Sequence, residues 1–173
     1  MSELMPVVNE FSHELNDRGF AVNRGWNDEL ANALIMKSRE DQMLQAVPRD
    51  ASERFADVVS AEAWYTRTDR LVYSLGETAT LSGLIWFGYS PRPELHADYT
   101  FAIRLYENAR GAKLSLPFMR AAHADFHHAR SSAVWLETDR DNDVAKNLYI
   151  KFGYEVMATD DRIVMTYRDR QNN

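Results

Sequence analysis

The stretch that decides the fold is NDVAKNLYIKFGY, at residues 142–154. Asn142 is a residue type that caps helices, and apolar residues follow it at helical spacing. Ala145 and Tyr149 are four positions apart, so they share one face of the predicted helix. Gly153 suits the end of this helix, because glycine adopts a left-handed backbone at little cost. The stretch therefore predicts a helix that starts after Asn142, ends at Gly153 and leads into a strand.

Helices and strands are predicted on both sides of this stretch. Downstream, two strand-like runs at 155–158 and 163–167 predict a closing hairpin. Upstream, the predicted elements are a helix at about 5–18, a strand at 20–23, helices at 28–37 and about 51–63, strands at 71–75, 81–87 and 99–106, a helix spanning 114–126, and a strand at 133–138. This order predicts one mixed α/β layer structure rather than a doubly wound parallel fold.

The composition bounds the class of protein. A length of 173 residues favours a single domain, 1–173, and 45% hydrophobic residues are typical of a globular chain. The 20 basic and 26 acidic side chains give a net charge of -6, which argues against a nucleic-acid binder. Because cysteine is absent, disulfides, cysteine metal ligands and a cysteine nucleophile are excluded. Without a secretory signal or a run of ~20 apolar residues, we expect a soluble cytoplasmic protein with no membrane contact.

The pattern N-x-x-A-x-x-L-Y-x-x-x-G-Y carries a family resemblance. It is formed by Asn142, Ala145, Leu148, Tyr149, Gly153 and Tyr154. With the order of elements, it resembles the C-terminal motif of the GNAT superfamily of acyl-CoA-dependent N-acyltransferases. The resemblance covers about residues 20–168 and implies an α/β (mixed α+β) fold. Its central sheet would be mixed, mostly antiparallel and flanked by helices, with a V-shaped split between the fourth and fifth strands.

A second segment resembles the pyrophosphate-binding motif of this family, R/Q-x-x-G-x-G/A. It consists of Arg110, Gly111, Ala112, Lys113, Leu114 and Ser115. A helix N-terminus offers backbone N–H groups and a positive dipole end to a diphosphate. The segment departs from the motif, because Lys113 stands at the first glycine and Ser115 at the second small position. Lys113 either adds positive charge near a phosphate or crowds it.

The resemblance implies a cofactor substrate and its contacts. Acetyl-CoA would be the acyl donor, and an acetyl or other short acyl group would pass directly to a primary amine. The backbone of Arg104, Leu105 and Tyr106 would bond to the pantetheine arm, and the amides of 110–115 would hold the pyrophosphate. Asn142 would contact the pantetheine region.

The resemblance also implies an acid, and the reaction needs a base. Tyr149 matches the tyrosine that protonates the departing CoA thiolate, and a phenol with a pKa of about 10 stays protonated at neutral pH. The base would be a carboxylate, or a water held by one. Glu137, Glu107 and Asp98 are the candidates, and strand alternation places Glu137 on the same face as Trp135. We take Glu137 as the candidate base.

Several alternatives stay open at this stage. The acceptor would be a small amine or a peptide amine, and the acidic balance favours a cationic one such as a polyamine, an aminoglycoside or a lysine-containing peptide. The altered glycine positions also allow a non-catalytic GNAT-fold acyl-CoA sensor or partner-binding module, and a homodimer remains open. His123 and His127 share a helical face without a third ligand, so we expect a solvated face and no metal site.

Overall fold

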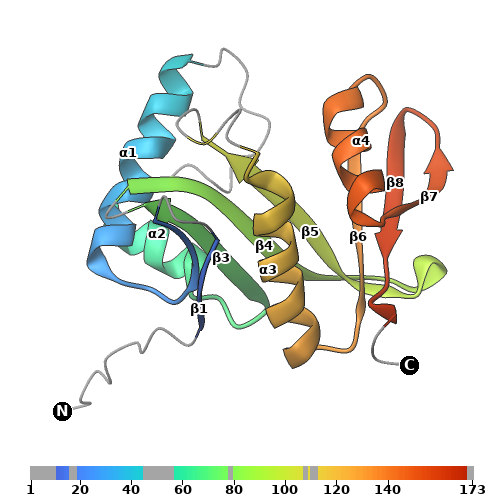
Figure 1. The fold of residues 1–173 in the computed structure, drawn as a ribbon, viewed down its shortest axis with the longest axis horizontal. Helices are drawn as coiled ribbons and strands as arrows, with labels where there is room; N and C mark the ends of the chain where they lie inside the picture. Colours follow the sequence, from blue (N-terminus) through green and yellow to red (C-terminus); the bar gives the residue numbers. More distant parts are fainter. Residues whose placement is uncertain are drawn as a thin grey trace.

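The computed structural model describes residues 11–15, 19–44, 57–77, 80–106, 109 and 113–170. Within them, the elements in chain order are β1 (Phe11–Glu14), β2 (Phe20–Arg24), α1 (Asp28–Leu44), α2 (Val58–Tyr65), β3 (Arg70–Glu77), β4 (Thr80–Arg92), the 3-10 turn η2 (Pro93–Leu95), β5 (Ala97–Leu105), α3 (Ser115–Ala129), β6 (Ala133–Asp139), α4 (Asp143–Phe152), β7 (Glu155–Thr159) and β8 (Arg162–Tyr167). The strands of the described residues form one sheet in the order β1-β2-β3-β4-β5-β6-β8-β7 (Figure 1). No helix of the described residues is long and apolar enough to cross a membrane.

Helices cover both faces of the sheet, and the alternation of side chains along each strand sets the two layers. Leu84 and Trp86 of β4 belong to the apolar cluster that α1 and α2 complete. Ile85 and Phe87 point to the other face, where they join the larger cluster around α3. The residues of α4 that pack against this larger cluster include Tyr149. The central strands are therefore buried on both faces.

The sheet splits between β5 and β6. All other neighbouring strands are antiparallel, whereas β5 and β6 run parallel and pair only over Ala97–Thr100 and Ala133–Trp135. Beyond this joint β5 continues to Leu105 and β6 to Asp139 without pairing to each other. The two strands diverge toward the end of the sheet where α3 and α4 begin (Figure 1). The mixed, mostly antiparallel sheet and its split are confirmed, with β5 and β6 as the fourth and fifth strands of the prediction.

The predicted N-terminal helix at about 5–18 is wrong where the structure describes it. Residues 11–14 form β1, which pairs antiparallel with β2 and extends the sheet by one strand. The Phe11 ring packs edge-on against Tyr73 at a centroid distance of 6.0 Å. The free edge of β2 and this aromatic contact outweigh a weak helical spacing of apolar residues. The remainder of the predicted helix, 5–10 and 16–18, lies outside the described residues.

Other boundaries shift without changing the element. The helix predicted to end at residue 37 continues to Leu44 as α1, and the next helix is α2 at Val58–Tyr65, with 51–56 outside the described residues. The strand predicted at 81–87 is longer at both ends in β4. β4 passes through Pro91 and ends at Arg92, beside an irregularity in its pairing with β5. A proline is tolerated at such a site because no ladder hydrogen bond is required of it.

Candidate active site

Tyr149 lies on the inner face of α4 and is directed at the split. Its ring meets Phe101, the first residue of β5 beyond the joint, at right angles with a centroid distance of 6.2 Å. The Tyr154 ring completes a cluster of three, at centroid distances of 5.8 Å from both Tyr149 and Phe101. Burial raises the pKa of Tyr149 to about 12. The phenol therefore stays protonated at neutral pH and can act there as a proton donor.

Asn142 caps the helix that carries Tyr149. Its Oδ1 accepts a hydrogen bond from the Ala145 backbone N–H at 3.2 Å. Asp143 follows in the first turn, where it complements the helix dipole and pairs with Lys146 at 2.8 Å. Gly153 ends the helix with a φ of 128°, a backbone that favours glycine. The motif residues therefore build and orient α4. The N-terminus of this helix, which the exposed Asn142 caps, lies at the end toward which the split opens (Figure 1).

The N-terminus of α3, in contrast, has no capping side chain. Leu114 stands at the cap position in a helical conformation, its side chain is buried, and no side chain caps the first turn. No acidic residue lies in that turn, and Pro117 supplies no N–H. The exposed Lys113 precedes it with a φ of 57°, in the left-handed region that favours the glycine of the motif. The helix begins with backbone N–H groups that its own side chains do not satisfy. Arg110, Gly111 and Ala112 lie outside the described residues.

The predicted pantetheine segment lies at the end of β5. Arg104 and Leu105 are half-buried strand residues beyond the β5–β6 joint. Tyr106 follows the strand, and its N–H donates to Ser82 O on β4 at 2.9 Å. The Tyr106 ring is buried between two cations, with Arg104 at 6.0 Å and Lys37 at 5.7 Å from its centroid. β4 pairs with Arg104 and Leu105, whereas the pairing of β5 with β6 has already ended at Thr100.

Glu137 lies on the face of β6 opposite α4. Its neighbour Leu136 points into the larger cluster, so alternation turns Glu137 to the other face together with Trp135, as predicted. Arg92 contacts Glu137 Oε1 at 3.1 Å, and Arg162 contacts Oε2 at 3.4 Å. Arg92 thus donates a hydrogen bond to one oxygen of the carboxylate, and Arg162 forms an ion pair with the other.

The other carboxylate candidates are less suited. Asp98 lies exposed on the paired part of β5, where Ser132 Oγ donates to its Oδ2 at 3.3 Å. Glu107 lies outside the described residues. Of the five aromatic residues at positions 64, 65, 86, 87 and 89, four are core residues and Tyr89 is exposed. The four are Trp64, Tyr65, Trp86 and Phe87.

The sequence-based prediction fails at His123 and His127. The prediction of a solvated histidine face is wrong, because both side chains are buried, at 2% and 4% exposure. A signal was present in the sequence: both follow Met119 at four-residue spacing, so they continue an apolar stripe of α3. No cluster of three metal-ligating side chains is found among the described residues.

Comparison with known proteins gives a result for structure and none for sequence. The sequence matches no protein-family model and no curated protein. Ribosomal-protein-S5-alanine acetyltransferase from Vibrio fischeri superposes with a TM-score of 0.70 at 10% identity, over 93% of this chain and 98% of that one. RimL, a ribosomal L7/L12 alpha-N-protein acetyltransferase solved with coenzyme A, gives 0.69 at 11% identity, over 91% and 98%. The GNAT domain of S. lividans PAT gives 0.68 at 10% identity, over 87% and 90%. At these identities the likeness shows the fold, and this chain has the GNAT fold.

Proposed function

We propose that this GNAT-fold protein is an N-acyltransferase that moves an acetyl or other short acyl group from acyl-CoA directly to a primary amine. The observation that carries the proposal is the split itself: the pairing of β5 with β6 ends at Thr100, and Tyr149 lies against Phe101, the next residue of β5. The complete α4 motif and the open N-terminus of α3 meet the same gap. The fold shared with acetyltransferases supports the assignment.

In this proposal acetyl-CoA occupies the gap between β5 and β6. The pantetheine arm would form hydrogen bonds with the backbone of Arg104, Leu105 and Tyr106, as a neighbouring strand does. The pyrophosphate would lie against the segment 110–115 and the first amides of α3, which supply N–H groups and a favourable dipole. Asn142 would contact the pantetheine from the opposite wall with its amide N–H₂, since its Oδ1 caps α4.

The chemistry would proceed in one transfer. The amine nitrogen attacks the thioester carbonyl and forms the C–N bond, and collapse of the tetrahedral intermediate breaks the C–S bond. Tyr149 gives its phenolic proton to the departing sulfur, so that CoA leaves as a thiol. Glu137 would receive the surplus proton of the amine, directly or through a water, while Arg92 and Arg162 orient its carboxylate.

The acceptor would reach the gap from the face that holds Glu137. Two similar structures are named as acetylating ribosomal proteins, one at an alanine and one at an α-amino group. Asp139 lies on the same face as Glu137, two residues further along β6. We propose a protein α-amine or another cationic amine as acceptor and a cytoplasmic location, where acetyl-CoA is available. A homodimer is compatible with this assignment.

A second candidate function rests on two specific observations. Lys113 replaces a motif glycine, and both oxygens of Glu137 contact arginines, which fits a protein that binds acyl-CoA without transferring the acyl group. The two functions share the cofactor and differ in turnover.

The experiment that tests the proposal combines binding with turnover. Acetyl-CoA at saturating concentration should raise the melting temperature by several degrees, because ligand binding to the folded state alone stabilises it, whereas ATP at the same concentration should not. Release of free CoA thiol should then depend on an amine, tested with an N-terminal alanine peptide, a lysine peptide and spermidine. Binding without thiol release from any amine would leave the sensor function, and the absence of a shift would refute both.

A further inference from the structure

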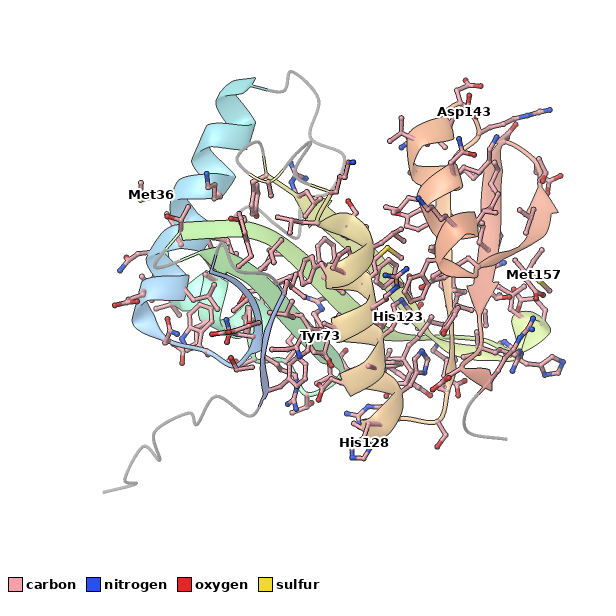
Figure 2. All side chains as sticks on the ribbon, viewed as in Figure 1. Met36, Tyr73, His123, His128, Asp143 and Met157 are labelled. Atoms are coloured by element: carbon pink, nitrogen blue, oxygen red, sulfur yellow. The ribbon has the colours of Figure 1, made fainter. Side chains whose placement is uncertain are left out.

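Two buried histidines lie on the side of α3 that faces the C-terminal half of the molecule. Figure 2 shows His123 on this side, whereas His128 lies at the exposed end of the helix. The rings of Phe87, Phe101, Phe152 and Tyr154 surround His123 within 6 Å of its centroid. Imidazole is costly to bury without partners, so its hydrogen bonds show what holds it there.

The histidines belong to a continuous chain of hydrogen bonds. The phenolic oxygen of Tyr154 lies 3.0 Å from His123 Nε2, and His123 Nδ1 lies 3.2 Å from His127 Nε2. Tyr154 is buried at 3% exposure, so the chain begins deep in the core. It links three ionisable side chains from two segments that are distant in sequence.

The inner end of the chain lies beside the candidate acid. The rings of Tyr149 and Tyr154 are 5.8 Å apart, and both pack against Phe101. Burial raises the pKa of Tyr154 well above 10, and a charge on Tyr149 raises that pKa further. The pKa of Tyr154 therefore responds to the ionisation of Tyr149.

The outer end of the chain opens into a cavity of about 380 Å³ between α3 and the C-terminal segment. His127 and His123 both line this cavity, and the other lining residues are Arg120, Ala124, His128, Phe152, Tyr167 and Asp169. The cavity has a mouth to solvent, since Arg120 and His128 are exposed. Water can therefore reach the His127 end, whereas the Tyr154 end is closed off by aromatic rings.

The protonation states suit the passage of a proton. Burial lowers the pKa of His123 well below 6.5, and it lowers that of His127 as well, with Asp169 opposing the change. Both imidazoles are therefore neutral at pH 7. A neutral imidazole carries one N–H and one acceptor nitrogen, so two such rings in series can pass a proton from one end to the other.

We propose that Tyr154, His123 and His127 form a proton relay that returns a proton to Tyr149 after each acyl transfer. The inference rests on the proposed function, because Tyr149 must first give its proton to the CoA sulfur. None of the three touches the reacting atoms, so they act through Tyr149. The relay provides a route from solvent that does not cross the acyl donor site.

The proton balance of one cycle is as follows. No hydrogen bond joins the hydroxyls of Tyr154 and Tyr149, so Tyr154 gives its O–H proton to a bridging water that passes one of its own protons to the Tyr149 phenolate, and His123 Nε2–H replaces the proton of Tyr154. His127 Nε2–H moves to His123 Nδ1, and His127 takes one proton from water in the cavity on Nδ1. One proton enters at the cavity and one reaches Tyr149, and rotation of the O–H group and exchange of the ring tautomers restore the starting state.

Charged groups from each neighbouring element set the pH response of the relay. At the cavity these are Arg120 and His128 from α3, and Asp169 after β8, with the phenol of Tyr167 beside them. At the inner end the titratable neighbour is Tyr149 from α4. Lowering the pH toward protonation of the histidine pair should stop the relay, because a doubly protonated ring no longer accepts.

The test compares a relay variant with a matched control. His127→Gln retains volume and a hydrogen bond to His123 but cannot change its protonation, so kcat should fall about tenfold or more with KM for acetyl-CoA unchanged. The solvent isotope effect on kcat should rise, because reprotonation becomes slow. His13→Gln, an exposed histidine on β1, should alter neither.

A second variant guards against a loss that is only structural. His127→Ala should lose activity similarly, and added imidazole should restore it by entering the enlarged cavity, while leaving the wild type and His13→Gln unchanged. Full activity in His127→Gln, or a failure of imidazole to rescue a folded His127→Ala, would overturn the relay. Absence of acetyl transfer in the wild type would instead refute the proposed function, and nitrogen NMR of the imidazoles would still show whether one tautomer passes into the other.

Discussion

The N-termini of α3 and α4 meet the same split and are built in opposite ways. At α4, Asn142 caps the first turn and Asp143 complements the dipole. At α3, a buried leucine occupies the cap position, no acid follows, and the preceding Lys113 has a left-handed backbone. One helix satisfies its own start, and the other leaves its first N–H groups to something outside it.

This difference separates two tasks within one cleft. A capped helix is a rigid support for a side chain. The capped helix α4 carries Tyr149 about two turns from its start. A helix whose first turn is not capped by its own side chains presents backbone N–H groups, which can bind an anion. We therefore expect substitutions on α4 to change the chemical step and substitutions at the start of α3 to change binding.

The largest effect should come from Tyr149→Phe, which removes the proton donor and keeps the ring against Phe101. We expect kcat to fall by about 100-fold or more, with the Kd for CoA unchanged. Steady-state kinetics and calorimetric titration measure the two quantities separately, and Tyr89→Phe, on an exposed ring, is the control. A Tyr149→Phe variant that lost CoA affinity instead would remove the division of tasks between the helices.

The helices also differ in their buried faces, since only α3 carries buried imidazoles among the described residues. Burial lowers the pKa of His123 and His127 in the folded protein below the usual 6.5, so the unfolded chain takes up protons first as the pH falls. Stability should be complete above pH 7 and decline from about pH 6.5 downward, by up to about 1.4 kcal/mol per pH unit for each histidine.

Urea unfolding between pH 7.5 and 5 measures this slope. His127→Gln should reduce the slope over this range, whereas His13→Gln should leave it unaltered. An equal slope in all three proteins would show that the acid loss arises from other groups.

Placing an acid at the start of α3 should reverse the roles of the two helices. Ser115→Glu puts a negative charge where the pyrophosphate is proposed to lie, and we expect about tenfold weaker CoA binding. The same change should slightly stabilise the folded protein, because a first-turn acid complements the dipole. Ser115→Gln has the same size without the charge and should bind CoA normally. A loss of affinity in both variants would point to crowding rather than charge.

Removing the cap of α4 should have a smaller effect, and this effect should be a loss of folding stability. Asn142→Ala leaves the Ala145 N–H without its acceptor and should lower the free energy of unfolding by about 1 kcal/mol. Asn142→Asp keeps an acceptor and should preserve stability, while it tests whether the amide N–H₂ contributes to CoA binding. Thermal unfolding and CoA titration of the pair separate capping from contact.

The smallest effect should come from Lys113, where two contributions can be separated. Lys113→Ala keeps the left-handed backbone and removes the charge, so CoA binding should weaken a few-fold. Lys113→Gly removes the same charge and relieves the backbone, and should be about 0.5 to 1 kcal/mol more stable than Lys113→Ala. Equal CoA affinity in the wild type and in Lys113→Ala would mean that the lysine side chain occupies the position of the motif glycine without contributing to CoA binding.

The sequence predicts best where local rules and tertiary packing agree. The helix from Asp143 to Phe152 begins and ends where Asn142 and Gly153 place it, because caps act within one turn. Residues 11–14 were misjudged because their pairing with β2 is a tertiary contact that periodicity does not report. His123 and His127 were misjudged because the polar character of imidazole conceals its position on an apolar stripe. Strand alternation predicts the face of β6 on which Glu137 lies. Its two arginine partners come from other strands, so the sequence does not predict them.

The short joint between β5 and β6 has a consequence for the order of folding. Its strands are parallel and separated in sequence by α3, whereas β3, β4 and β5 form consecutive hairpins, as do β7 and β8. Non-local parallel pairing forms slowly, because the loop must close before any bond repays it. We expect the two halves of the sheet to form first and to join last, so that the cleft arises in the final step. Pulsed hydrogen exchange during refolding should then protect the amides of β3 and β4 before those of Ala133–Trp135.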